Sequence, residues 1–144
     1  MLRLAIFSMA GLVFLSACDQ GAHSPRGFRL PEGDAANGQQ LFTSYGCFAC
    51  HEVDGIEDQG QKLLASPVKL GGPVTLNKTY ADILTSIVNP SHRINRTLDQ
   101  SEVQRDGHSV MTNYNEQMTV AHLIDLVTFV ETTYELIDVP RTRP

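Results

Sequence analysis

The sequence predicts a small all-α domain with three to five helices and long irregular loops. Stretches 33–46, 79–89 and 120–136 place apolar residues three and four positions apart, which is the spacing of one helix face. The segments between them, 52–78 and 91–110, are rich in polar residues and turn formers and lack such a period. No strand–helix–strand pattern interrupts this order.

The first 17 residues are predicted to be a signal peptide. Arg3 precedes an apolar run over 4–15 that is too short to span a bilayer permanently. Leu15-Ser16-Ala17-Cys18 resembles the lipobox of bacterial lipoproteins. We therefore expect cleavage before Cys18 and lipid on its thiol, and an ordinary signal peptide is the alternative.

The rest of the chain divides into a tether and a domain. Residues 18–31 contain glycine, serine and proline without periodicity, which predicts a flexible tether that begins at the lipid-bearing cysteine. Residues 32–144 are then the folded domain. Asp19 follows the lipobox and implies retention in the inner membrane, so we expect an exported, lipid-anchored protein on the periplasmic side.

The charge of the chain narrows the choice of partners. The precursor has a formal net charge of −5, and removal of Arg3 with the leader makes the mature chain more acidic. An acidic surface argues against nucleic acid and is compatible with a protein partner that presents a basic patch.

The first helix is expected over 33–46. Asp34 can cap its N-terminus, and Gly46 ends it. The residues that share one face are Gly38, Leu41, Phe42 and Tyr45.

The two later helices carry their own start signals. Thr79 and Asp82 resemble a capping box for the helix over 79–89. Thr119 can cap the helix over 120–136. The predicted apolar arc of that last helix is wide and consists of Val120, Leu123, Ile124, Leu126, Val127, Val130 and Tyr134, extended by Phe129.

Cys47-Phe48-Ala49-Cys50-His51 reads C-x-x-C-H, the attachment motif of a c-type haem. Two thiols at this spacing can each bond one vinyl group of a porphyrin, and the histidine then lies under the iron. A thioredoxin-like pair would need a strand–helix–strand context, and a zinc site would need a fourth ligand at matching spacing. We expect three to five helices wrapped around one covalently bound haem c.

If His51 binds one side of the iron, the opposite side is available to a second ligand. Met118 and Leu123 are placed for a hydrophobic staple, so Met118 is better explained by packing. Met111 lies in an irregular segment, and a loop can reach over the open face. The candidates are Met111, Met118, His92, His108 and His122, and the first is favoured.

The chain resembles the class I bacterial cytochromes c over roughly residues 32–136. The matching segments are Gly33–Phe42 for the first helix, Cys47–His51 for the haem motif, Gly72-Pro73 for a turn, Met111-x-x-Tyr114 for the ligand loop and Leu123–Val130 for the last helix.

The resemblance implies roles for these residues. His51 and Met111 would be the axial ligands of the haem iron, and the Pro73 carbonyl would accept a hydrogen bond from His51. Gly38 and Phe129 would form the contact between the first and last helices.

The implied function is the transfer of single electrons between a donor and an acceptor protein, without enzymatic activity. Thr112 stands where the family usually has proline, which would leave the ligand loop less rigid. A haem enzyme or ligand sensor with an open sixth site, and a fixed cytochrome subunit of a larger complex, are the alternatives.

Overall fold

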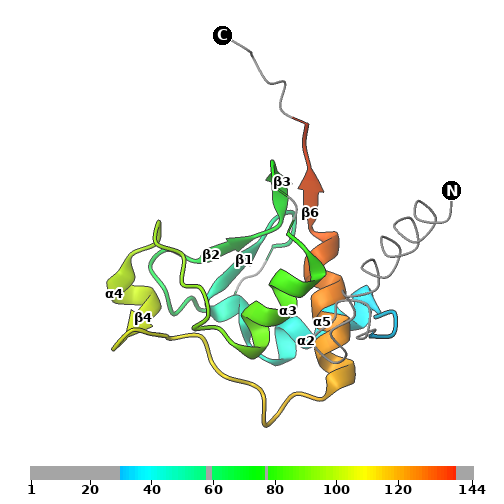
Figure 1. The fold of residues 1–144 in the computed structure, drawn as a ribbon, viewed down its shortest axis with the longest axis horizontal. Helices are drawn as coiled ribbons and strands as arrows, with labels where there is room; N and C mark the ends of the chain where they lie inside the picture. Colours follow the sequence, from blue (N-terminus) through cyan, green and yellow to red (C-terminus); the bar gives the residue numbers. More distant parts are fainter. Residues whose placement is uncertain (1–29, 58–59, 77, 139–144) are drawn as a thin grey trace, which may run out of the picture. The chain divides into compact units, whose positions relative to one another are not determined.

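The computed structural model describes residues 30–57, 60–76 and 78–138 (Figure 1). The chain divides into two units, Met1–Pro31 and Glu32–Pro144, and nearly all described residues belong to the second. The predicted signal peptide and the lipidation of Cys18 lie outside the described residues and stay predictions. Within the described ranges, no helix is long and apolar enough to cross a membrane.

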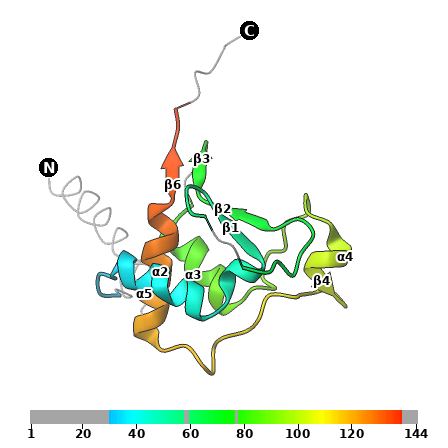
Figure 2. The same cartoon turned by 180° about the vertical axis from the view of Figure 1, so that it is seen from behind.

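Helices make up most of the regular structure of the second unit (Figures 1 and 2). In chain order the elements are α2 (Ala35–Ser44), the 3-10 helix η3 (Cys47–Ala49), β1 (His51–Val53), β2 (Val68–Leu70), β3 (Gly72–Val74), α3 (Tyr80–Val88), α4 (Gln100–Val103), β4 (Gln104–Arg105), β5 (His108–Ser109), α5 (Val120–Thr132) and β6 (Tyr134–Leu136). The three predicted helices correspond to α2, α3 and α5.

The predicted helix starts are confirmed. The Asp34 carboxylate accepts hydrogen bonds from two N–H groups of the first turn of α2, at 2.8 and 3.1 Å. Thr79 and Asp82 form the capping box of α3, in which each side chain accepts from the other residue's backbone N–H. The Thr119 hydroxyl accepts from the His122 N–H at 3.1 Å and caps α5. Each cap satisfies backbone donors that the helix itself leaves unpaired.

Three short strand pairs were not part of the all-α prediction. β1 pairs with β2 and β3 with β6, both parallel, while β4 and β5 form an antiparallel hairpin. Strands of two or three residues are too short for an alternating pattern to be visible in the sequence. Because β6 pairs with β3, the last helix ends at Thr132 and does not continue to 136 as predicted.

The crossing of α2 and α5 depends on a glycine. A Cβ placed on Gly38 would overlap the backbone carbonyl of Asp125 and would lie 2.7 Å from the Phe129 Cβ. The two helices therefore approach more closely than a side chain at this position would allow. This confirms the predicted contact between Gly38 and Phe129.

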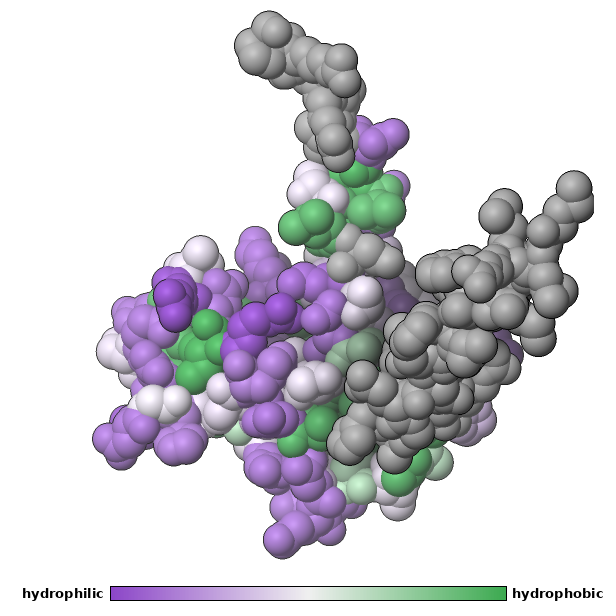
Figure 3. All heavy atoms as spheres, viewed as in Figure 1, coloured by the Kyte–Doolittle hydropathy of each residue, from purple (hydrophilic) through white to green (hydrophobic). Residues whose placement is uncertain are grey.

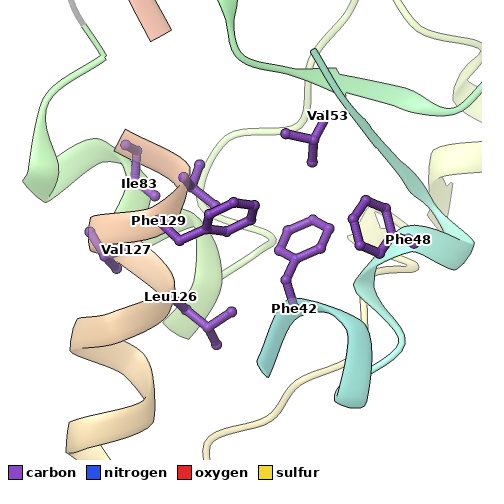
Figure 4. Packing of buried hydrophobic residues seen from close by; sticks show 8 residues of the cluster. Phe42, Phe48, Val53, Ile83, Leu126, Val127 and Phe129 are labelled. Carbon is purple, nitrogen blue, oxygen red and sulfur yellow. The ribbon is translucent and has the colours of Figure 1, made fainter. Parts of the chain in front are cut away.

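The core lies where α2, α3 and α5 meet the haem motif (Figure 4). The Phe42 ring packs edge-on against Phe48 and Phe129, with ring centroids 4.7 and 5.6 Å apart. Val127 is completely buried beside them. Phe48 belongs to the pentapeptide itself, so the packing that builds the core also fixes that segment.

The outer surface carries separate apolar groups. The face in Figure 3 is mostly hydrophilic, with hydrophobic residues in several distinct places. Val120, which we predicted on the apolar arc of the last helix, is 65% exposed. It is the first residue of α5, where the helix extends past the elements that cover its middle.

Asp125 of α5 accepts two hydrogen bonds from residues at the start of α2. Its carboxylate accepts a hydrogen bond from the Asp34 N–H at 2.8 Å and from the Asn37 side-chain amide at 2.7 Å. The backbone bond from Asp34, followed by the bond from Asn37, lowers the pKa of Asp125 below its ordinary value. The charged form of Asp125 therefore stabilises the folded state.

We expect Asp125→Ala to unfold at lower urea concentration than the wild type at neutral pH. Because the folded pKa is depressed, the contribution of Asp125 is present above its unfolded pKa and is lost as pH falls through the folded pKa. The difference between the two proteins should thus shrink in acid, below a pH of about 4. Glu131→Ala, at an exposed position of the same helix, is the control, and equal effects of both changes would contradict this assignment.

Candidate haem-attachment site

The first four residues of the pentapeptide form one tight turn shortly after α2. Gly46 adopts a left-handed backbone with φ of +70°, which glycine tolerates without strain. η3 follows, and the Cys50 N–H donates to the Cys47 carbonyl at 3.2 Å. The glycine that was predicted to end the helix therefore also redirects the chain, so that both thiols lie within a single turn.

The two cysteines are free and partly buried. Burial raises the pKa of the Cys47 thiol to about 11 and also raises that of Cys50. Both thiols are therefore protonated at neutral pH, which does not favour thiolate metal binding. In the described part of the chain, no group of three or more His, Cys, Asp and Glu could hold a metal ion. These features fit two thioether bonds to one haem.

His51, the first residue of β1, presents one ring nitrogen to the backbone. Its Nδ1 lies 3.3 Å from the Val68 carbonyl oxygen of β2. Since a carbonyl can only accept, Nδ1 carries the proton and Nε2 keeps its lone pair. Burial is the main cause that lowers the pKa of His51, so the ring is neutral. A neutral imidazole with an oriented Nε2 is what an axial iron ligand requires.

The backbone partner of His51 differs from the predicted one. Pro73, which the resemblance implied for this role, lies on β3 opposite Glu135 of β6. Parallel pairing of β1 with β2 places Val68 opposite His51. The structure thus brings Val68 to the imidazole and takes Pro73 to the other strand pair. Such a register cannot be read from the local sequence.

The loop that carries Met111 runs between β5 and α5. The Met111 N–H donates to the Ser109 hydroxyl at 3.2 Å, and the side chain is partly buried. Three residues later, the Tyr114 hydroxyl donates to the Tyr45 carbonyl at 2.7 Å, at the end of α2. The loop is thereby tied to the element that leads into the haem motif.

Tyr114 also links this loop to the two thiols. Burial raises the pKa of the Tyr114 phenol, and the nearby Cys47 and Cys50 raise it further. A side-chain hydrogen bond from Thr112 acts in the opposite direction.

The other candidate iron ligands pack against the core, contact other protein groups or are exposed to solvent. Met118 packs against the hydrophobic core, as the staple predicted. His122 Nδ1 lies 2.8 Å from the Tyr45 hydroxyl. His92 is exposed and contacts a backbone oxygen at the end of α3, and His108 is exposed on the β4–β5 hairpin. Their surroundings account for these residues without a haem.

A surface hollow of about 260 Å³ lies at the start of α5. Its lining consists of Val88, Asn115, Met118, Thr119, Val120 and Leu123. None of the predicted haem residues lines it, so it takes no part in the site.

Comparison with known proteins gives one match. The family model described as Cytochrome c matches residues 35–134, which is more than half of the chain. The matched region contains the pentapeptide and the Met111 loop. No curated protein and no solved structure matches the chain.

Proposed function

Because the chain belongs to the cytochrome c family and therefore binds covalently attached haem c, we propose that it is a monohaem carrier of single electrons. In this proposal Cys47 and Cys50 would hold the haem, and His51 and Met111 would be the two protein ligands of its iron. The observation that carries the proposal is the partly buried imidazole of His51, whose Nδ1 faces the Val68 carbonyl, directly after two thiols in one turn.

Each residue of the turn has a physical role. When bound, the haem supplies an iron that accepts and releases one electron. The Val68 carbonyl fixes the His51 tautomer and makes the imidazole a better donor. The Met111 thioether is soft and uncharged, and such a ligand favours the reduced iron and raises the reduction potential. If His51 and Met111 both bound the iron, the chain would leave no position on it for a substrate, so we propose a carrier and not an enzyme.

Tyr114 supports this closed arrangement. Its hydroxyl bond to the Tyr45 carbonyl holds the Met111 loop against the end of α2. A loop without proline would otherwise lose more conformational entropy when its methionine binds a metal. We infer that this cross-link offsets part of the flexibility introduced by Thr112.

We further propose export to the periplasmic side of the inner membrane, with a lipid anchor on Cys18. This rests on the leader and lipobox of the sequence. The partners would be a donor and an acceptor redox protein, and the acidic charge of the chain favours partners with basic docking patches.

Met111→Leu tests the assignment of the sixth ligand. It keeps apolar volume but removes the sulfur, so we expect the reduced, haem-loaded variant to bind carbon monoxide and to change its absorption spectrum. Met118→Leu is the matched control, because Met118 packs against the core, and it should keep the wild-type spectrum. If Met111→Leu also keeps the wild-type spectrum, Met111 is not the ligand.

A further inference from the structure

Lys62 contacts both sides of the haem-attachment turn. Its Nζ donates to the Phe48 carbonyl at 2.9 Å and to the His51 carbonyl at 3.3 Å. The neighbouring Leu63 N–H donates to the Ala49 carbonyl at 2.7 Å. The segment between β1 and β2 is thus fastened to the pentapeptide by two adjacent residues.

We propose that Lys62 is a positioning residue that braces the haem-attachment turn and that its positive charge raises the reduction potential of the bound haem. The proposal goes beyond the carrier function. It depends on a haem held by Cys47 and Cys50 and is independent of which residue occupies the sixth position.

The bracing follows from backbone hydrogen bonding. A 3-10 helix of three residues leaves carbonyl groups at its end without partners inside the helix. An ammonium group has three donors and no acceptor, so one side chain can satisfy a carbonyl of this helix and a second carbonyl in the strand that follows. Lys62 does this for Phe48 and His51, the residues on either side of Ala49 and Cys50. Removal of the ammonium would leave both carbonyls to find other donors.

The Phe48 ring strengthens the arrangement. The Lys62 Nζ lies 5.7 Å from its centroid, within the range of a cation–π interaction. Lys62 is partly buried, so its aliphatic stem packs on protein while the charge reaches inward to the turn. A charge placed there is less screened by salt than one on an exposed side chain.

The electrostatic effect has a definite sign. The Lys62 Nζ lies 3.3 Å from the His51 carbonyl oxygen, so its positive charge acts at short range on that residue. The same charge disfavours the ferric form of an iron bound to the His51 ring, since the ferric form carries one more positive charge than the ferrous form. The acidic side chains that follow the motif, Glu52 and Asp54, act in the opposite direction but are exposed. We therefore expect the effect of Lys62 to exceed theirs.

The test is a redox titration of the full-length, haem-loaded protein that compares Lys62→Gln with Lys62→Arg. Glutamine keeps a donor and loses the charge, and we expect it to lower the equilibrium constant for reduction by about threefold, which is about 30 mV for one electron. Arginine keeps the charge and should restore the wild-type potential. Lys69→Gln removes an exposed lysine from β2 as a control and should shift the potential less.

Two results would overturn the proposal. A Lys62→Gln potential equal to that of the wild type would leave Lys62 with at most a structural role, even if the variant unfolds at lower urea concentration. Equal falls in potential for Lys62→Gln and Lys62→Arg would show that the charge is not responsible. Because each variant is compared with the wild type, an error in the Met111 assignment would change all the potentials together and leave these differences interpretable.

Discussion

The double variant Cys47→Ala/Cys50→Ala, produced in cells with a haem-attachment system, is expected to retain no haem after denaturation. Both thiols belong to one turn, where they can bond the two vinyl groups of the same porphyrin. His51 remains in this variant, but a coordinate bond is broken when the chain unfolds. The mass of the denatured chain should therefore be that of the polypeptide alone, whereas the wild type should carry the added mass of one haem.

Cys18→Ala is the matched control for that measurement, since Cys18 is the one cysteine of the chain outside the haem motif and is predicted to bear lipid. It should keep the covalent haem and lose its membrane association. A double variant that still carries covalent haem would contradict the assignment of the thiols. Loss of haem from Cys18→Ala in material of the same export state would contradict it as well.

Gly38→Val is expected to lower the free energy of unfolding of the domain by about 3 kcal/mol, the upper end of the usual cost of overpacking. A Cβ on Gly38 would lie 2.7 Å from both the Asp125 carbonyl carbon and the Phe129 Cβ. Backbone atoms of α5 cannot rotate away as a side chain can, so α2 and α5 must separate. Overpacking costs about 1–3 kcal/mol even in cores that can adjust, whereas replacing glycine in a helix gains about 1 kcal/mol at most.

A loss of about 3 kcal/mol is a substantial part of the total stability of about 5–15 kcal/mol that is usual for a domain. Gly38→Ala should be the milder form and lower the free energy of unfolding by at most about 2 kcal/mol, because the gain from replacing glycine offsets part of the overpacking cost. Urea titration followed by circular dichroism measures both variants. Gln40→Val introduces the same side chain at an exposed position of α2 and should change stability little. Wild-type stability of Gly38→Val would show that the helices do not cross as closely as described.

The helices could be predicted from the sequence because their determinants are local. Asp34, Thr79 and Thr119 cap elements that begin one residue later, and each cap is visible as a residue type next to an apolar period. The contact of Gly38 with Phe129 was reached through the family resemblance. It spans 91 positions, and spacing within one helix could not have supplied it.

The strand pairs mostly could not be predicted, with one exception. Asp106 and Gly107 have φ of +51° and +79°, the backbone of a type I′ turn, and Asp-Gly is a strong hairpin signal. That dipeptide could have predicted the β4–β5 hairpin. β1 with β2 and β3 with β6 are joined across long segments, and nothing within their two or three residues specifies the partner.

The residues of the site also fall into those that the sequence could identify and those that it could not. Cys47, Cys50 and His51 are adjacent in sequence, so their spacing alone identified a haem motif. Val68 and Lys62 act on the motif from the following segment, and their roles depend on how that segment folds back. A lysine in a loop or a valine in a three-residue strand carries no signal of its own, which is why sequence reasoning missed both.

The most direct measurement of the proposed function is exposure of the reduced, haem-loaded wild-type protein to carbon monoxide. If His51 and Met111 occupy both axial positions, the absorption spectrum should stay unchanged while the protein still accepts and releases one electron per chain. Rapid carbon monoxide binding at neutral pH would show an open or readily displaced sixth position. That result would contradict the carrier and favour a haem enzyme or a ligand sensor.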